Sequence, residues 1–161
     1  MLTKVSDSFG LQGEVKWIKS KNGIIIAESE FMPNRVMGNN GRGISIFLDR
    51  LISNNTHTGN IRFADIGDDD TLATAADTDL GNGLVRAQVG AVSRSGLSAE
   101  FRFFYASAVT PDDTYEEFGM FVDGNTAVGS GQLFNHLVFA TPLVKTTGED
   151  HTVVCRITGA V

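Results

Sequence analysis

The stretch LVRAQVGAVSRSGLSAEFRFFYAS, residues 84–107, decides the fold. Apolar residues occupy every second position on either side of Ser95-Gly96, a pair that suits a tight turn. Successive side chains of a strand point to opposite faces, so this period is typical of a strand with one buried face. The apolar positions are Val85, Ala87, Val89 and Ala91 before the turn and Leu97, Ala99, Phe101, Phe103 and Tyr105 after it. The stretch therefore predicts two long antiparallel strands.

Further segments show strand patterns of the same kind. They are residues 14–19, 24–30, 61–66, 115–122, 132–140 and 151–158. Asn22-Gly23 predicts a hairpin between the first two, because both residues accept positive φ. Residues 115–122 and 132–140 also suit a hairpin. Seven or eight strands with short turns cannot close a core as one flat layer. We therefore expect a mainly β fold, an antiparallel, jelly-roll-like β-sandwich.

One helix is predicted at about residues 43–53. Its apolar residues recur at spacings of three and four and share one helix face; they are Ile44, Phe47, Leu48, Leu51 and Ile52. The glycine-rich stretch Gly38–Gly43 before it suggests a flexible connector, with an anion-binding turn as the alternative. Residues 1–13 have no period and suggest an extended N-terminal arm, which leaves residues 14–161 as a single domain.

Composition limits the partners. The 161 residues carry 19 acidic and 13 basic side chains, a formal charge of -6, which disfavours nucleic acid and anionic membranes as partners. The longest uninterrupted apolar run, Ile24 to Ala27, is too short to cross a bilayer. The single cysteine, Cys155, lies in an alternating run and is expected to be a buried small hydrophobe. No membrane or nucleic-acid role is expected.

No set of residues forms a recognisable catalytic or metal-binding pattern. His57, His136 and His151 are far apart in the sequence, and none has the spacing of a zinc site. Ser130 lies between glycines outside any nucleophile motif, so we interpret it as a loop residue. The run Asp68–Asp70 suggests calcium only weakly, because the spaced ligands of an EF-hand loop are missing. We expect no enzyme activity, no cofactor and no metal.

Glu116 and Glu117 are adjacent carboxylates within a predicted strand. Neighbours in a strand point to opposite faces, so the two cannot act together as a glycosidase pair. We expect one of them to face water and the other to bind backbone.

From Ile61 onward the chain carries a recurrent pattern. A strand ending at Gly67 is followed by the Thr/Ala/Asp-rich residues 71–79, then Leu80 and a strand arginine, Arg86. An aromatic strand and an E-x-G-hydrophobic-F element come next, with Glu117, Gly119 and Phe121 at its defining positions, followed by Gln132-Leu133-Phe134, Phe139, Pro142 and Lys145-Thr146. This pattern resembles small structural proteins of tailed bacteriophages. The loop differs from the usual pattern at Asp68–Asp70, and the first sixty residues match only loosely.

The element defined by Glu117, Gly119 and Phe121 suits packing. Its glycine would let a large side chain cross closely, and Phe121 would fill the core.

The resemblance implies a non-catalytic virion structural protein, made in the host cytoplasm. It favours a capsid decoration (cement) protein on the head shell, bound to the major capsid protein or other virion subunits and forming a homo-oligomer, preferably a trimer. The alternatives are a tail, baseplate or fibre-attachment component, and a carbohydrate-binding β-sandwich module. The latter would need an aromatic platform, for which the candidates are Trp17, Tyr105 and Tyr115.

Four apolar residues outside the periodic segments are candidates for the partner interface: Phe9, Leu11, Phe31 and Met32. Their alternative role is to cap the ends of the core. Phe104 lies opposite the register of its aromatic neighbours and would cover a second sheet or face a partner.

Overall fold

The computed structural model describes residues 10–38 and 42–160. Within them it contains nine strands and one helix. In chain order these are β1 (Gly10–Lys21), β2 (Ile24–Glu28), β3 (Met32–Val36), α1 (Ile44–Leu51), β4 (Ile61–Gly67), β5 (Gly83–Ser95), β6 (Ser98–Tyr105), β7 (Asp113–Val122), β8 (Gln132–Lys145) and β9 (Glu149–Ala160). The fold is mainly β, as predicted, and all strand pairs are antiparallel.

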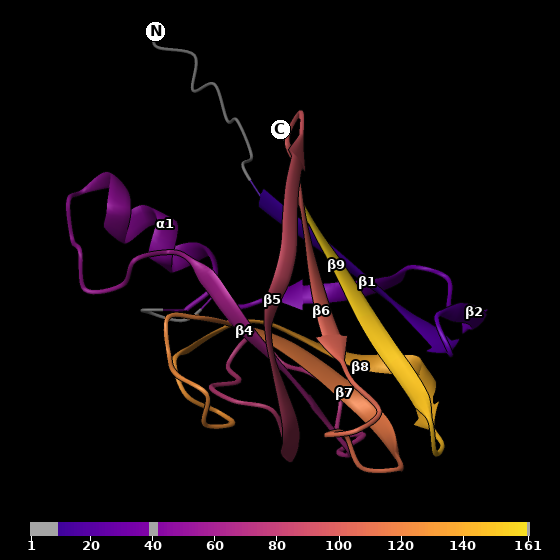
Figure 1. Ribbon diagram of the computed structural model, residues 1–161. Coiled ribbons are helices and arrows are strands. Elements are labelled where there is room, and N and C mark those ends of the chain that lie inside the picture. Colours follow the sequence, from indigo (N-terminus) through magenta and orange to yellow (C-terminus); the bar gives the residue numbers. More distant parts are fainter. Residues whose placement is uncertain (1–9, 39–41, 161) are drawn as a thin grey trace, which may run out of the picture.

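The strands close into a barrel (Figure 1). Neighbouring strands follow the order β1-β3-β8-β7-β4-β5-β6-β9, and β9 pairs with β1 to complete a ring of eight. The predicted two-sheet sandwich is therefore wrong. The reason lies in β1: one edge pairs along its whole length with β9, while Gly13–Val15 on the other edge pair with β3. Alternating patterns are the same in a sandwich and in a barrel, so the sequence could not separate them.

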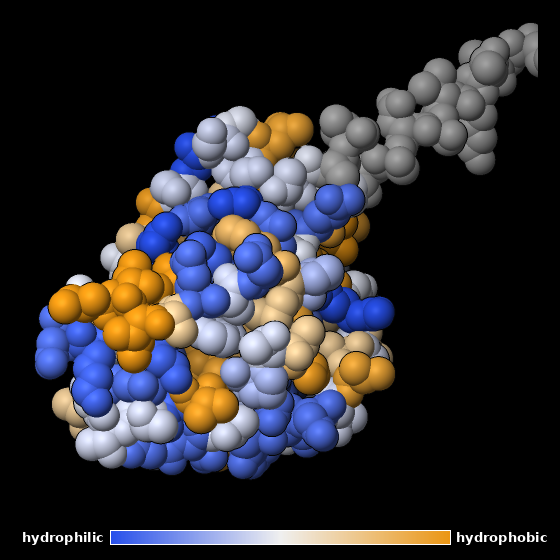
Figure 2. Space-filling model, turned by 90° about the vertical axis from the view of Figure 1, so that its right-hand side faces the viewer, coloured by the Kyte–Doolittle hydropathy of each residue, from blue (hydrophilic) through white to orange (hydrophobic). Residues whose placement is uncertain are grey.

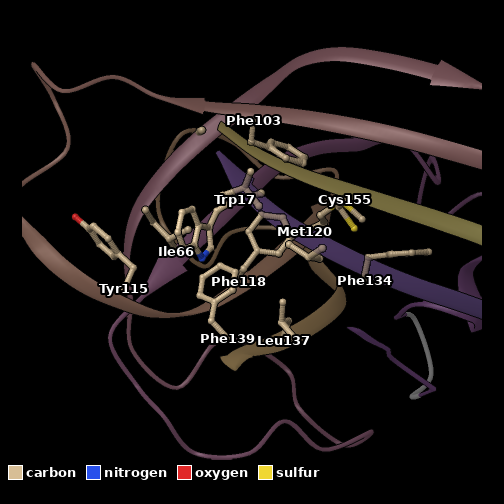
Figure 3. Close-up of a cluster of buried hydrophobic side chains, with 14 of the residues drawn as sticks. Trp17, Ile66, Phe103, Tyr115, Phe118, Met120, Phe134, Leu137, Phe139 and Cys155 are labelled. Carbon is tan, nitrogen blue, oxygen red and sulfur yellow. The ribbon is translucent and has the colours of Figure 1, made fainter. Parts of the chain in front are cut away.

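Large side chains fill the barrel interior, as is usual for a ring of this size (Figure 3). The rings of Phe103 and Phe118 meet edge to face, with centroids 5.9 Å apart. Two buried aromatic side chains hydrogen-bond to the backbone. The Trp17 indole N–H donates to the carbonyl of Thr141 at 2.9 Å, and the Tyr105 hydroxyl donates to the carbonyl of Ala64 at 3.0 Å. The interior is thus a packed core with its polar atoms satisfied at these points.

The predicted hairpins are present. Asn22 and Gly23 join β1 and β2 with φ of 52° and 77°, the positive values that such a turn requires. The β5–β6 turn falls at Gly96-Leu97, one residue later than predicted. β7 and β8 pair as expected.

Two segments in the first part of the chain differ from the prediction. Residues 32–36, where no strand was predicted, form β3 in spite of Pro33. β3 pairs with β1 through its first half and with β8 only through Arg35 and Val36, so Pro33 lies where β8 needs no hydrogen bond from it. β1 begins at Gly10, so the end of the predicted N-terminal arm belongs to a strand, while residues 1–9 lie outside the described residues.

The helix is confirmed at Ile44–Leu51. It extends to one side of the barrel (Figure 1). No helix in residues 10–38 and 42–160 has the length and apolar character needed to cross a membrane.

Candidate functional site

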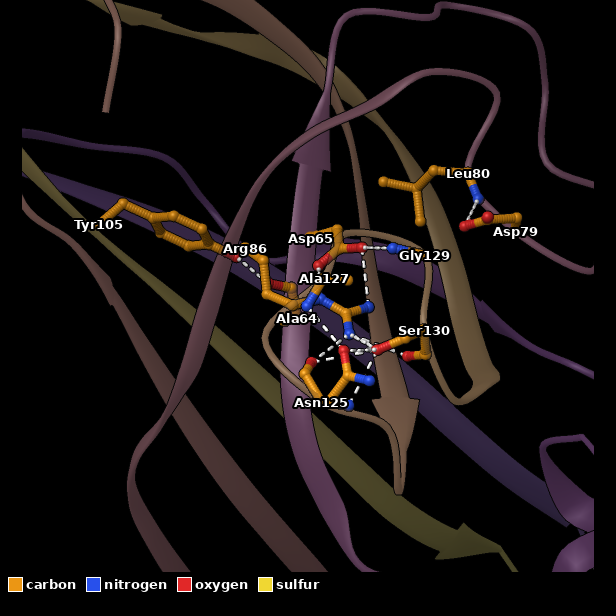
Figure 4. A network of polar contacts seen from close by, with 10 residues as sticks. All are labelled: Ala64, Asp65, Asp79, Leu80, Arg86, Tyr105, Asn125, Ala127, Gly129 and Ser130. Atoms are coloured by element: carbon orange, nitrogen blue, oxygen red, sulfur yellow. Dashed lines mark hydrogen bonds and ion pairs between the residues drawn. The ribbon is translucent and has the colours of Figure 1, made fainter. Parts of the chain in front are cut away.

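A buried arginine–carboxylate pair lies where β4, β5 and the β7–β8 loop meet (Figure 4). The Arg86 and Asp65 side chains are only 3% and 0% exposed. Arg86 Nε and Nη2 donate to the two oxygens of Asp65 at 2.5 and 2.9 Å. Its Nη1 donates to the carbonyls of Asn125 and Ser130 and to the Ser130 hydroxyl. Every nitrogen of the guanidinium is therefore occupied within the fold.

Aromatic rings complete this arrangement. The Arg86 guanidinium lies 5.2 Å from the Phe63 ring centroid and 4.7 Å from that of Phe121. Burial raises the pKa of Asp65 in spite of its bonds to Arg86 and to the backbone N–H of Gly129. The network fixes the β7–β8 loop on the barrel. Ser130 is thus a structural part of it, where the sequence suggested only a loop residue.

A second buried network centres on His136 of β8. Its Nδ1 lies 2.6 Å from Asp77 Oδ2, and its Nε2 lies 2.8 Å from Glu117 Oε2. Glu117 also accepts the backbone N–H groups of Gly81 and Asn82 at 2.9 and 2.7 Å. The network therefore ties the β4–β5 loop to β7 and β8, and Glu117 is the glutamate that binds backbone.

His136 is charged when both of its nitrogens donate. Burial disfavours the imidazolium, but the hydrogen bonds to Glu117 and Asp77 outweigh burial and raise the pKa of His136. Burial likewise opposes the charge of Asp77, but its bonds to Thr74 and His136 lower the pKa of Asp77. The geometry accordingly describes a charged histidine between two carboxylates.

Replacing His136 with glutamine should cost roughly 2 kcal/mol or more, because a glutamine cannot bridge two carboxylates with charged hydrogen bonds. The stability contributed by the charged ring is present below pH 6.5, its ordinary pKa, and is lost as pH rises through the raised value. The parent should therefore weaken from neutral to alkaline pH, and His136→Gln should lack that part of the loss. Urea unfolding across this range measures both effects. His57→Gln, in a loop, is the control. An equal loss of unfolding free energy in His57→Gln would contradict the role given to His136.

His151 of β9 has the opposite environment. It is 1% exposed, and neither ring nitrogen has a hydrogen-bond partner in the described structure. Burial, and then the charge of Lys19, lower the pKa of His151 to about 4. Cys155 is buried as predicted, and burial raises the pKa of its thiol to about 12. Neither side chain is presented to a ligand at the surface.

The remaining residues of the E-x-G-hydrophobic-F element pack tightly. A Cβ on Gly119 would lie 2.5 Å from Leu80 Cδ1 and 2.9 Å from the carbonyl oxygen of Asn135, so only glycine fits without a shift. Phe121 is fully buried in a small cluster with Met37, Leu80 and Leu133. Both positions serve packing in this fold.

The candidate anchors from the sequence lie in different environments. Leu11 packs partly against the core, and Met32, 7% exposed, belongs to it. Phe31 is half-buried beneath the charged ends of Lys16 and Arg156. Leu11 and Phe31 line one surface groove together with the exposed Leu72. Phe9 lies outside the described residues.

The exposure of the other candidate residues decides between their proposed roles. Phe104 is 54% exposed and points away from the interior. The three possible platform aromatics, Trp17, Tyr105 and Tyr115, are all buried, so they form no glycan platform. Across residues 10–38 and 42–160, no group of three or more His, Cys, Asp or Glu side chains is placed to hold a metal ion. In the acidic run, Asp68 and Asp69 accept hydrogen bonds from Asn82 and Thr71.

The apolar face of α1 points outward. Its exposed residues are Phe47 (44%), Leu48 (56%), Leu51 (81%) and, at the C-cap, Ile52 (76%). Ile46, which is 1% exposed, anchors the helix on the core, and the inner edge of Phe47 contacts Phe134 edge to face with ring centroids 6.1 Å apart. The periodicity identified the helix but not the direction of its apolar face.

The entry into α1 sets this direction. The Ile44 N–H donates to the carbonyl of Met37 at 3.1 Å, and Gly43 has a φ of 51°. A Cβ on Gly43 would lie 2.0 Å from the Met37 oxygen, so the turn requires glycine. The helix start is therefore fixed against the end of β3, and Ile46 becomes the residue that enters the core.

A second apolar surface is β2. The three isoleucines Ile24, Ile25 and Ile26 are 68%, 62% and 49% exposed. The signal in the sequence is the lack of alternation, because three successive isoleucines cannot all face one core.

Comparisons with protein-family models, with curated proteins and with solved structures gave no match for this chain.

Proposed function

We propose that this chain is a non-catalytic virion structural protein, a capsid decoration (cement) protein that binds and stabilises the head shell of a tailed phage. The observation that carries the proposal is the outward apolar face of α1, made of Phe47, Leu48, Leu51 and Ile52. The resemblance of residues 61 onward to phage structural proteins supplies the kind of partner. The partner on the shell is the major capsid protein or another virion subunit, and the chain is located on the capsid surface.

The α1 face has the composition of an interface. Burying an exposed leucine or isoleucine side chain fully is worth about 1.5–3 kcal/mol, and a monomer gains none of this from side chains left in water. Contiguous exposed apolar surface accordingly marks sites of association. Leu51 and Ile52, 81% and 76% exposed, therefore have the most to gain from a covering surface.

The polar networks support a role in association. Arg86 and His136 bind partners within the chain, so each stabilises a loop. Both networks are satisfied within the chain, which leaves the exposed apolar residues of α1 as the candidate association surface.

Replacing Leu51 with lysine should weaken attachment to the particle by roughly 10- to 100-fold, the equivalent of one buried leucine side chain. Val109→Lys is the matched control, because Val109 is 76% exposed and lies in the β6–β7 connection. Binding of each variant to particles that lack the protein measures the effect. Equal attachment of Leu51→Lys and the parent would contradict the proposed surface.

Copy number separates the head from the tail. Densitometry of purified virions should give a number comparable to that of the shell subunits. A number comparable to that of tail or baseplate components would contradict decoration and favour the tail, baseplate or fibre-attachment role.

A further inference from the structure

β2 is the one described strand outside the barrel ring. It pairs with β1 through Ile18–Lys21 and has no second strand neighbour among the described residues. All five of its residues are exposed. Figure 1 shows it at the side of the barrel opposite α1. Figure 2 views the molecule from that side and shows raised hydrophobic patches among hydrophilic residues.

The free edge of β2 is an association surface of a specific kind. An edge strand presents backbone N–H and C=O groups that a further strand can pair with. Proteins commonly block such edges with charged residues or proline, but Ile24 to Ala27 contain neither. Glu28 at the end is already paired with Lys16 at 3.1 Å. The chemistry of the edge therefore fits an extended, uncharged strand with β-branched side chains.

We propose that β2 pairs antiparallel with β2 of a second copy of this chain. The eight other strands use both of their edges, at least in part, to close the ring. β2 is therefore the one described strand that each copy can offer with a whole edge free. Pairing the two copies joins two β1–β2 ribbons into one continuous antiparallel sheet of four strands.

The residues brought together by a two-fold axis are compatible. With the axis at Ile25, Ile24 lies opposite Ile26, and Glu28 lies opposite Asn22. With the axis at Ile26, Ile25 lies opposite Ala27, and Glu28 lies opposite Ile24. Neither register places like charges opposite each other, and both form pairs of β-branched or small apolar residues, which stabilise antiparallel strands. The contact thus adds no direct like-charge pair to the long-range repulsion between two copies of formal charge -6.

The size of the contact sets its strength. Two five-residue strands bury less than the ~800 Å² per partner of a standard interface, so dimerisation should depend on concentration. A two-fold contact predicts a dimer, where the resemblance to phage proteins favours a trimer. The contact does not depend on attachment to a shell, so it can be tested on the isolated protein.

Sedimentation equilibrium tests the contact. The mass of the parent should rise with concentration from 17.3 kDa toward twice that value, and Ile25→Lys should remain at 17.3 kDa. Val109→Lys and Leu51→Lys, both at exposed apolar residues away from β2, should associate like the parent. A parent that stays monomeric, a trimer, or association that is lost in Leu51→Lys but kept in Ile25→Lys would overturn the proposal.

Cysteine cross-linking tests the register independently. The natural Cys155 is buried and its pKa is raised to about 12, so an introduced surface cysteine is the reactive thiol. A residue on the two-fold axis faces its own copy at a distance that a disulfide can span. Single cysteine variants are made at positions 24–27. The variant with its cysteine at position 25 or 26 should therefore give the highest yield of disulfide-linked dimer. Equal or greater cross-linking through Leu51→Cys would overturn the proposal.

Discussion

Replacing Arg86 with methionine should destabilise the barrel by about 3–5 kcal/mol, because the change leaves a buried carboxylate without its charged partner. Asp65 is fully buried and its two oxygens both accept hydrogen bonds from Arg86. The change also removes the bonds that hold the β7–β8 loop at Asn125 and Ser130. Urea unfolding followed by circular dichroism measures the free energy of unfolding.

Two further variants test whether the loss of stability comes from the burial of the Arg86–Asp65 pair. Arg102→Met removes an arginine that also binds a carboxylate, Glu100 at 2.8 Å, but its side chain is 48% exposed. It should cost no more than about 1 kcal/mol. The double variant Asp65→Leu/Arg86→Met removes both charges and should recover part of the loss. A loss for Arg86→Met no larger than that for Arg102→Met would show that the buried pair does not hold this region.

Acid should weaken the fold through His151. Its pKa is lowered from 6.5 to about 4 in the folded chain, so the unfolded chain binds the proton first as pH falls below 6.5. Stability is then lost across this window and levels off near pH 4. One pKa unit corresponds to 1.36 kcal/mol, so the full loss is about 3 kcal/mol. The cause is burial without a hydrogen-bond partner for either ring nitrogen.

His151→Leu should remove this part of the acid dependence, because leucine has no proton to gain. Urea unfolding at several pH values between 4 and 6.5, the two limits of the window, measures the slope. His136→Gln is the comparison, since its effect has the opposite sign and lies on the alkaline side. An acid slope for His151→Leu as steep as that of the parent would mean that other groups cause the loss.

Local patterns predicted most of the secondary structure. The alternation in residues 84–107 gave β5 and β6, and Asn22-Gly23 gave the first hairpin. These features depend on neighbours in the chain, which the sequence shows directly. β3 was missed because Pro33 usually ends a strand, and only its place at the junction of β1 and β8 makes it acceptable.

Features that depend on distant residues could not be predicted in the same way. Arg86 and Asp65 are 21 positions apart, and His136 and Asp77 are 59 apart. Nothing in the local sequence of either histidine shows that His136 meets two carboxylates and that His151 meets none.

The direction of the α1 apolar face depends on a contact outside the helix. The backbone of Met37 fixes the start of the helix, so Ile46 enters the core and the periodic apolar face points outward. The periodicity of a helix shows that one face is apolar, but an apolar face packs equally well on its own core or on a partner.

A density map of the intact particle would show whether this protein binds neighbouring subunits through α1, as we propose. We expect a barrel repeated over the head shell, with Leu51 and Ile52 buried against an adjacent subunit. A map in which these two side chains face solvent, or in which the protein is absent from the shell, would contradict it.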